Sequence, residues 1–410
     1  MADLKWLNLD QTIRLAFSWN SDADKKSIGS SFFLAHMIGG VIESSLFMLG
    51  AMLAITFFFP QLSTTLAKVS GTSWIAGGVL GLVATIALTV GLGAATYFIF
   101  KRLGWFDERK HGKLFGKVLN LRLLVVAIYV VAFIIVFIPS VQTIKTILNS
   151  ATDASGMLSQ AAALLLAPQG IAVIAAVLSG IVIFAVGWIL WAYVFGYFLM
   201  ANVLRLAGVK SRFVEVNLKN VINYLKFTIV IAVTLLFNYV SKKMMKIQLG
   251  LIILLIGSIV AGLALSASGA MIVAAIIAFI VFAMYSVTVA YNTYRFSVAA
   301  WAFMTRKDGA ATPALKESWE MTRGYVVSIA IIYFVIGIIV GLISLLLTLP
   351  AGALGLVSDS IPLLTPVWSA ADTVTSALTF TVTMFTTTLM AASIYSQLRE
   401  ASGRKKLIFK

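Results

Sequence analysis

Residues 312–349 read TPALKESWEMTRGYVVSIAIIYFVIGIIVGLISLLLTL, and this stretch decides the class of fold. Its second part, residues 325–349, is apolar and contains no charged side chain. A helix of that length can cross the hydrocarbon core of a bilayer. The first part is short and carries both signs of charge. The stretch therefore predicts a membrane-spanning helix preceded by a polar segment at the membrane surface.

The composition of the whole chain points to the same class. Of its 410 residues, 60% are hydrophobic and 11% are charged, and the mean hydropathy is +1.00. An ordinary soluble domain is about 25% charged, and a disordered chain has low hydrophobicity. Both of those classes are excluded. We predict a single all-α integral membrane domain, multi-pass, in the cell (inner) membrane.

Apolar stretches of spanning length predict eight transmembrane helices. They cover about 29–59, 74–101, 121–139, 170–204, 227–241, 270–294, 325–349 and 372–397. One further stretch, 247–267, is also apolar enough to span. We interpret 242–268 as an interfacial or re-entrant hairpin on the outer side, or as an extension of its neighbours. A nine-span chain is the alternative.

Basic residues define the orientation of these spans. The net charge is +16, and 26 of the 31 basic residues fall in five segments on one side of the eight-span chain. We call these the inner segments; they are about 1–28, 101–122, 205–226, 295–323 and 399–410. Because basic residues concentrate on the cytoplasmic side, both termini are predicted to be cytoplasmic. This charge indicates contact with anionic lipids of the inner leaflet and no nucleic-acid partner.

The chain also contains a weak internal repeat. Arg102-Leu103 matches Arg205-Leu206, and each pair follows a span end that is rich in aromatic residues. Four units are predicted, over about 9–102, 103–206, 207–305 and 306–400, followed by a basic cytoplasmic tail at 401–410. Each unit is expected to contain a cytoplasmic amphipathic helix before its first span, at 9–19, 113–122, 213–226 or 312–323.

The amphipathic helices are predicted to lie at the inner membrane surface. In the last of them, Thr312 and Pro313 are expected to start the helix and Gly324 to end it. Aromatic residues would anchor these helices among the lipid headgroups. The expected anchors are Trp19, Phe213, Tyr224 and Trp319. Candidate docking residues for lipids or partner membrane subunits are Lys219, Lys226, Lys316, Trp319 and Arg323.

Residues 314–324 read ALKESWEMTRG and stand between two apolar spans. This stretch resembles a signature of a diffuse group of bacterial and archaeal membrane proteins. The group includes the YciC-like proteins and the membrane domain that is joined to some glycerophosphodiester phosphodiesterases. The resemblance implies a multi-span membrane module and no catalytic residue, and no segment here could form the phosphodiesterase domain.

Glu43 is the one acidic residue clearly inside a predicted span, where a charge is costly. His36 lies seven positions earlier, so both fall on one helical face about 10 Å apart. Ser44 adjoins Glu43. Two interpretations are open. The group is a proton or cation site, or Glu43 is a neutral carboxyl and His36 a neutral imidazole, each hydrogen-bonded between helices.

Motifs of enzymes and cofactor sites are missing from the sequence. There is no cysteine, there are two histidines, and no Walker A, GxGxxG, HExxH or GxSxG pattern occurs. We therefore expect no enzymatic activity, no cofactor and no metal. The expected function is a lipid-associated scaffold or accessory subunit of a membrane complex. The alternative is a transporter of an apolar or lipid-like substrate, with a proton site at Glu43.

Overall fold

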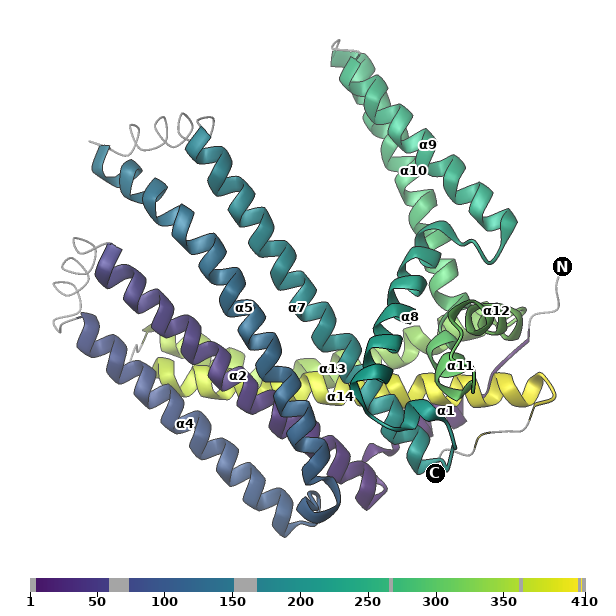
Figure 1. Cartoon of the computed structure of the whole chain (residues 1–410), viewed down its shortest axis with the longest axis horizontal. Coiled ribbons are helices and arrows are strands. Elements are labelled where there is room, and N and C mark those ends of the chain that lie inside the picture. The colour runs from purple at the N-terminus through teal and green to yellow at the C-terminus, as the bar shows by residue number, and fades with distance from the viewer. Residues whose placement is uncertain are drawn as a thin grey trace. The chain divides into compact units, whose positions relative to one another are not determined.

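The structure is a computed structural model, and it describes residues 5–58, 74–150, 168–264, 268–360, 364–404 and 407. Every regular element in these ranges is a helix, which confirms the all-α class (Figure 1). The long helices are α2 (Ala23–Phe58), α4 (Trp74–Arg102), α5 (Glu108–Ser150), α7 (Pro168–Leu206), α8 (Leu218–Phe237), α9 (Lys242–Ala264), α10 (Ser268–Arg295), α13 (Val326–Ser360) and α14 (Thr365–Ala401). The short ones are α1 (Leu9–Ala16), η1 (Ser18–Asn20), η2 (Arg212–Val214), α11 (Ala299–Thr305) and α12 (Ala311–Met321).

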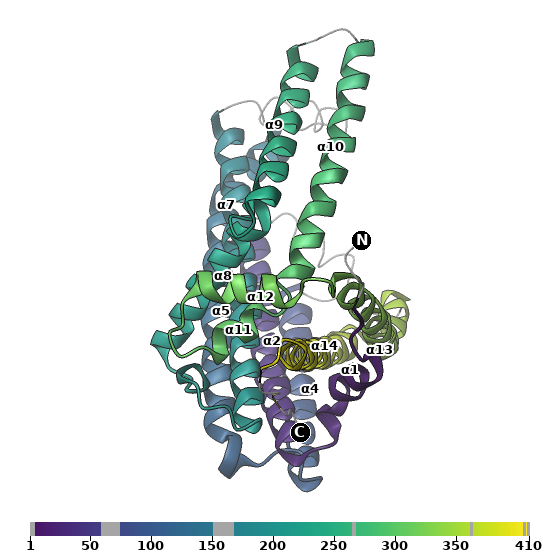
Figure 2. The same cartoon turned by 90° about the vertical axis from the view of Figure 1, so that its right-hand side faces the viewer.

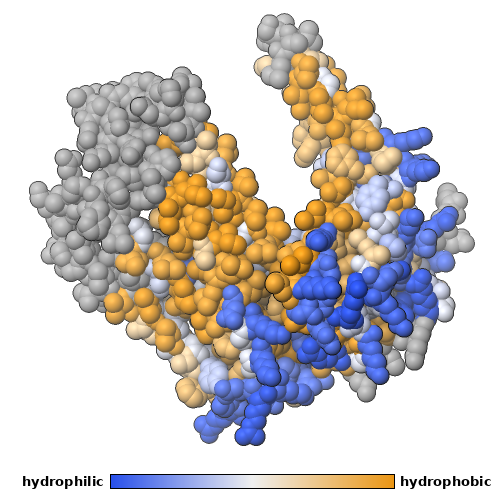
Figure 3. Space-filling model, viewed as in Figure 1, coloured by the Kyte–Doolittle hydropathy of each residue, from blue (hydrophilic) through white to orange (hydrophobic). Residues whose placement is uncertain are grey.

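Among the described residues, eight helices are long and apolar enough to cross a membrane, which confirms a multi-pass membrane protein. They are α4, α5, α7, α8, α9, α10, α13 and α14. The set includes α9, which we had not counted as a span. The predicted span 29–59 corresponds to α2, which contains His36, Glu43 and Ser44 and whose second half lies largely outside the fully described residues, so this span stays a prediction. Figure 3 shows apolar residues covering the visible faces of α7 and the α9–α10 pair.

Two of the four predicted amphipathic helices exist as separate elements. They are α1 and α12, whereas 113–122 and most of 213–226 are the first turns of α5 and α8. No glycine or proline interrupts residues 117–138 or 218–237, so the surface helix and the membrane helix run on as one. The start predicted for the last helix was also wrong. α12 is capped by Ala310, without a side-chain hydrogen bond, and Gly324 follows its end as expected.

The structure divides into two compact units, which are described separately. Unit 2 consists of residues 20–195 and 341–383. Its core is an apolar cluster in which Phe33, Leu34 and Met37 of α2 pack with Phe106 and with Ala377 of α14. The helix α2 packs along both α4 and α5, because its small and apolar residues face both neighbours.

Unit 1 consists of residues 1–19, 196–340 and 384–410. Its core is aromatic. Phe227 of α8 and Phe303 of α11 stack with ring centroids 4.2 Å apart, and Phe213 lies 4.7 Å from Phe303. Phe213 and Tyr224 are buried in this core, so their predicted role as headgroup anchors is wrong. Hydropathy alone does not show whether an aromatic ring on a surface helix faces the lipid or is covered by protein.

Within unit 1, α9 and α10 form a hairpin and run side by side in both views (Figures 1 and 2). Residues 242–264 are one uninterrupted helix, so the re-entrant hairpin predicted for 242–268 is wrong. The last turn of α8 contacts the base of the pair through buried amides. Asn238 Nδ2 donates to Asn292 Oδ1 at 2.6 Å, and Asn292 Nδ2 donates to the Leu235 carbonyl at 3.1 Å. Gln248 Nε2 donates to that same carbonyl at 2.9 Å.

Two membrane helices end in the same way. After α4, Gly104 adopts φ +69° and the Trp105 N–H donates to the Phe100 carbonyl at 2.7 Å. After α7, Gly208 also adopts φ +69°, and the Val209 N–H donates to the Leu204 carbonyl at 3.0 Å. Glycine adopts this left-handed conformation without steric cost, so the chain can satisfy the last carbonyls and turn sharply.

We predict that Asn292→Ala destabilises the protein by about 1–3 kcal/mol, because it leaves the amide of Asn238 without its buried partner. Thr293→Ala is the matched control. Thr293 is exposed, and its hydroxyl bonds only the Val289 carbonyl of its own helix. Melting temperatures in detergent measure both variants. Equal melting temperatures for Asn292→Ala and Thr293→Ala would contradict a stabilising role of the amide cluster.

Candidate functional site

In unit 2, the carboxylate of Glu43 is not alone. It forms a hydrogen-bonded ion pair with Arg122 of α5, and the Arg122 side chain is 7% exposed while that of Glu43 is 20% exposed. Arg122 Cγ also lies where a side chain at Gly39 would begin, so glycine on α2 makes room for it. The sequence analysis placed Arg122 in an inner segment and gave Glu43 no charged partner. The two residues are 79 positions apart, and hydropathy does not reveal which helices adjoin.

Trp191 of α7 connects the Glu43–Arg122 pair to His36. The guanidinium of Arg122 lies 5.3 Å from the centroid of the Trp191 ring. The His36 ring stacks on the same tryptophan at 5.3 Å and on Phe380 of α14 at 4.6 Å. A guanidinium over an aromatic face is electrostatically favourable. We call Glu43, Arg122, His36, Trp191 and Phe380 the intramembrane cluster.

Three buried polar atoms of the intramembrane cluster have no hydrogen-bond partner among the described residues. They are His36 Nδ1, Arg122 Nε and Trp191 Nε1. Buried polar atoms are usually satisfied, and such groups mark places where water or a ligand can enter. Ser44, the third predicted site residue, is exposed. The cluster thus joins Glu43 and His36 through residues that the sequence analysis did not single out.

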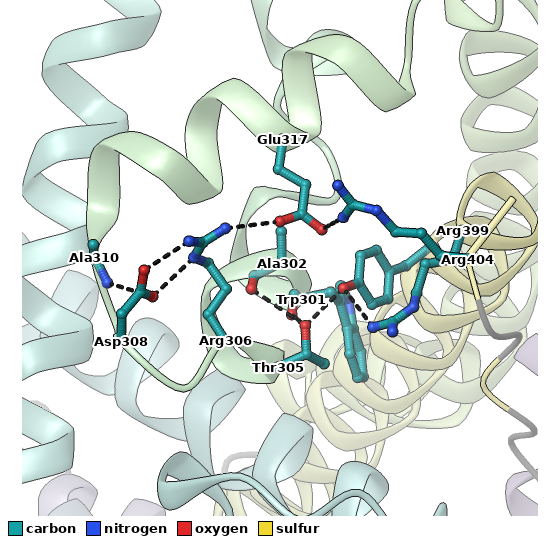
Figure 4. Close-up of polar contacts among 10 residues, drawn as sticks. Trp301, Ala302, Thr305, Arg306, Asp308, Ala310, Glu317, Arg399 and Arg404 are labelled. Carbon is teal, nitrogen blue, oxygen red and sulfur yellow. Dashed lines mark hydrogen bonds and ion pairs between the residues drawn. The ribbon is translucent and has the colours of Figure 1, made fainter. Parts of the chain in front are cut away.

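A second charged group lies in unit 1, on the predicted inner side. Glu317 of α12 lies between Arg306 and Arg404, as Figure 4 shows. The distance from Arg306 Nη1 to Glu317 Oε2 is 3.1 Å, and the Glu317 side chain is 9% exposed. Arg306 also pairs with Asp308 at 2.6 Å, and this guanidinium lowers the pKa of the Asp308 carboxyl to about 2. We call Glu317, Arg306, Arg404 and Asp308 the Glu317 cluster.

The Glu317 cluster ties the end of the chain to α11 and α12. Beside it, the hydroxyls of Thr305 and Tyr395 are hydrogen-bonded at 2.6 Å, and Arg399 Nη1 donates to the Tyr395 hydroxyl at 3.4 Å (Figure 4). A buried carboxylate held by two guanidiniums rigidifies the elements that carry these groups. The two acidic and two basic residues of the Glu317 cluster balance each other, so the arrangement is suited to structure rather than to proton transfer.

The candidate docking residues are placed differently from one another. Lys219, Lys226, Lys316 and Arg323 are exposed. Trp319 is half-buried instead, because its ring covers the guanidinium of Arg295 at 4.1 Å. The structure therefore leaves four of these five residues free to meet lipid or a partner. Neither Arg295 nor Glu317 stood out in the sequence, since each occupies an ordinary inner-segment position.

Within the described ranges, no group of three or more histidine, cysteine, aspartate or glutamate side chains is arranged to hold a metal ion. No protein-family model, curated protein or solved structure matches the chain. The resemblance of residues 314–324 to the YciC-like group therefore stays a prediction.

We predict that Glu43→Gln and Arg122→Gln each destabilise the protein by about 3 kcal/mol, because each leaves the other charge buried and unpaired. The double variant should recover much of this loss, since two amides can hydrogen-bond to each other. Thermal melting in detergent gives the coupling between the two sites.

The matched control for the Glu43 variants is Asp24→Asn. It breaks the exposed pair with Lys110, whose side chain is 57% exposed, and should cost about 1 kcal/mol or less. Additive losses in the Glu43 and Arg122 double variant would show that the two residues are not coupled.

Proposed function

We propose that this chain is a non-enzymatic, lipid-associated scaffold or accessory subunit of a membrane complex. The observation that carries the proposal is the pairing of Glu43 with Arg122. A carboxylate that is neutralised by a buried guanidinium holds two helices together and needs no transported ion to balance it. The charge that most favoured transport in the sequence is therefore best explained as part of the packing.

The apolar outer faces of the long helices support the same proposal. In α10, Phe279 is 72% exposed and Val287 is 68% exposed, and α7 exposes Val182 and Ile181 to a similar extent. Such faces fit lipid chains or partner helices, because a large exposed apolar surface is otherwise unfavourable. The inner side adds the exposed basic residues Lys219, Lys226 and Lys316 as contacts for anionic lipid or for a partner.

A transporter with a proton site at Glu43 is the second candidate. The unpartnered Nδ1 of His36 and Nε of Arg122 favour it, because water or a substrate could satisfy both atoms beside Glu43. In this case the Glu43–Arg122 pair would open during transport, and protonation of Glu43 would free Arg122. The resemblance to YciC-like proteins is compatible with either candidate.

We further propose that both termini lie on the same, cytoplasmic side. Hydrogen bonds within unit 1 join inner segments that are distant in sequence, and hydrogen-bonded groups must share one side of a membrane. Three of these bonds are Lys5 N–H to the Gly324 carbonyl at 3.1 Å, Asn8 N–H to Gln397 Oε1 at 2.6 Å, and Arg212 Nη2 to the Asp308 carbonyl at 2.8 Å. The chain therefore makes an even number of crossings between each pair of joined segments.

The even number of crossings constrains α8, α9 and α10, because these three helices lie between two inner segments and cannot all cross. α8 begins at Leu218, just after an inner loop, and it ends beside Asn292, one turn before α10 ends at Arg295. Both ends of α8 thus adjoin inner segments. We infer that α8 stays on the inner side of the membrane and that α9 and α10 make the two crossings.

The lysines at the start of α9 agree with this revised topology. The eight-span chain predicted from the sequence places Lys242, Lys243 and Lys246 outside, against the usual distribution of basic residues. If α9 crosses from the inner to the outer side, these three lysines at its start lie on the inner side with the other basic residues. Only Lys68 and Lys145 then remain on the outer side.

Single cysteines can test this topology, since the protein contains no native cysteine. We predict that Lys243→Cys is protected from an impermeant thiol reagent in intact cells and is labelled in inverted vesicles. Ser402→Cys serves as the inner control and Lys68→Cys as the outer one. Labelling of Lys243→Cys from outside would instead favour a crossing by α8.

The function itself is tested by photo-crosslinking in native membranes. We predict that a photoreactive residue at Lys316 or Lys219 forms a discrete adduct with a membrane protein. The same residue at Phe279, on the apolar face of α10, provides the comparison for lipid contact. Adducts with lipid alone at all three positions would contradict the scaffold proposal.

Reconstitution separates the transporter from the scaffold. The purified protein in vesicles is assayed for movement of fluorescent phosphatidylglycerol between leaflets, at several pH values. We expect the lipid to move between leaflets at the same rate as in vesicles without protein. A faster rate that Glu43→Gln abolishes, in a variant that still folds, would favour the transporter.

A further inference from the structure

A cavity of about 480 Å³ lies in unit 1 where α10 and α12 end and α13 begins. Tyr291 and Arg295 come from α10, Trp319 from α12, Arg323 from the segment before α13, and Val327 from the first turn of α13. A volume of this size is typical of small-molecule sites. The cavity combines two arginines with aromatic and aliphatic walls, so its chemistry is both cationic and apolar.

Arg295 is the buried cation of this cavity. The residue is 4% exposed, and its guanidinium lies between the rings of Trp319 at 4.1 Å and Tyr291 at 6.0 Å. Its Nη2 donates to the Trp319 carbonyl, while its Nε is buried without a hydrogen-bond partner. No carboxylate forms an ion pair with Arg295 in the described part of the chain. A buried charge without a counter-ion is costly, and an anion in the cavity would offset that cost.

Arg323 adds a second positive charge at the same cavity. Its side chain is exposed, and its charge acts on Arg295. Two guanidiniums that repel each other are both stabilised by a shared oxyanion, and arginine binds phosphate oxygens with two parallel hydrogen bonds. Glu320 also lines the cavity, on the exposed side of α12, and its carboxylate opposes an anion.

The position of the cavity indicates which phosphate it would bind. α10 and α13 are both apolar enough to cross a membrane, and the cavity lies at the end of α10 and the start of α13, where Arg295, Glu320 and Arg323 carry charge. This is the depth of lipid headgroups. Val326, Val327 and the exposed ring of Tyr291 continue the wall in apolar side chains, which suits a ligand with an apolar part.

We propose that the cavity between α10, α12 and the start of α13 binds the phosphodiester headgroup of an anionic phospholipid, with Arg295 and Arg323 as the phosphate ligands. This deepens the lipid association in the proposed function and rests on it. Arg295 supplies the fixed charge, held by the two aromatic rings. Arg323 closes the site from the exposed side, and the acyl chains lie along α13.

The test compares phospholipid retention by the purified protein and its variants in detergent, measured by native mass spectrometry. The probe is phosphatidylglycerol, with phosphatidylcholine and inorganic phosphate as the alternatives. Arg323→Gln should weaken phosphatidylglycerol binding about tenfold, which is the usual effect of losing one charge-assisted hydrogen bond. Glu320→Gln should strengthen it, because that change removes the opposing charge.

Lys316→Gln is the matched control, since Lys316 is an exposed cation on α12 that does not line the cavity. Its phosphatidylglycerol binding should stay within about twofold of that of the original protein. Equal losses in Arg323→Gln and Lys316→Gln, or no loss in either, would overturn the proposal. Displacement of the lipid by millimolar inorganic phosphate would identify free phosphate as the ligand and also overturn it.

Arg295→Gln is informative only if the variant folds, because Arg295 also bonds the Trp319 carbonyl. The Arg323 and Glu320 variants change exposed side chains, so they keep the test decisive. Failure of this test leaves the crosslinking result at Lys316 and Lys219 unaffected. The lipid site and the scaffold proposal are therefore separable.

Discussion

Backbone N–H and C=O groups find no partners in hydrocarbon, and this constraint shapes the whole molecule. It requires long uninterrupted helices, such as α5 and α7, in the apolar stretches. It also displaces polar side chains to the places where helices end. The amides of Asn238, Asn292 and Gln248 lie at the junction of α8 with the α9–α10 pair. In the Glu317 cluster, Arg306 and Asp308 follow the end of α11 and Arg404 follows the end of α14. The polar contacts at helix ends then determine which segments share a side.

The Glu43–Arg122 pair departs from this pattern, because it joins two charged side chains well inside long helices. The Lys101–Glu108 and Lys110–Asp24 pairs, in contrast, lie at helix ends. The cost of the Glu43–Arg122 pair is reduced by the ring of Trp191 and by the close approach that Gly39 permits. A pair of this kind specifies which face of α2 meets α5, whereas apolar side chains alone allow several rotations. We regard such specificity as the main contribution of the pair.

The sequence was sufficient to predict the class of fold, and the reason is the strong hydropathy of stretches such as 325–349. It was not sufficient for the partners of polar residues. Arg122 stands at the edge of an apolar stretch, so counting charges assigned it to a surface segment. Phe213 and Trp319 are aromatic residues in predicted surface helices, which is typical of headgroup anchors. In the structure, however, Phe213 is buried and Trp319 covers Arg295. These relations depend on packing between helices that are distant in sequence.

The same limit applied to α8 and α9. Both helices are apolar and of similar length, so their composition predicts a membrane span for each of them almost equally well. In the topology that we propose, what separates them is the buried contact of Asn238 with Asn292, a side chain that comes 54 positions later. A single amide pair of this kind carries topological information that no window of hydropathy contains.

The contacts of the first residues have a consequence for the order in which the chain can mature. The N–H of Leu7 donates to Ser328 Oγ, 321 positions later, and that of Asn8 to Gln397, 389 positions later. During synthesis the first residues emerge long before their partners exist. The helices between these contacts are therefore synthesised while the N-terminal segment still lacks its partners. The contact of Asn8 forms only after Gln397 of α14 has been made, so a chain that is cut off before Gln397 contains most of its helices but cannot fasten its N-terminal segment.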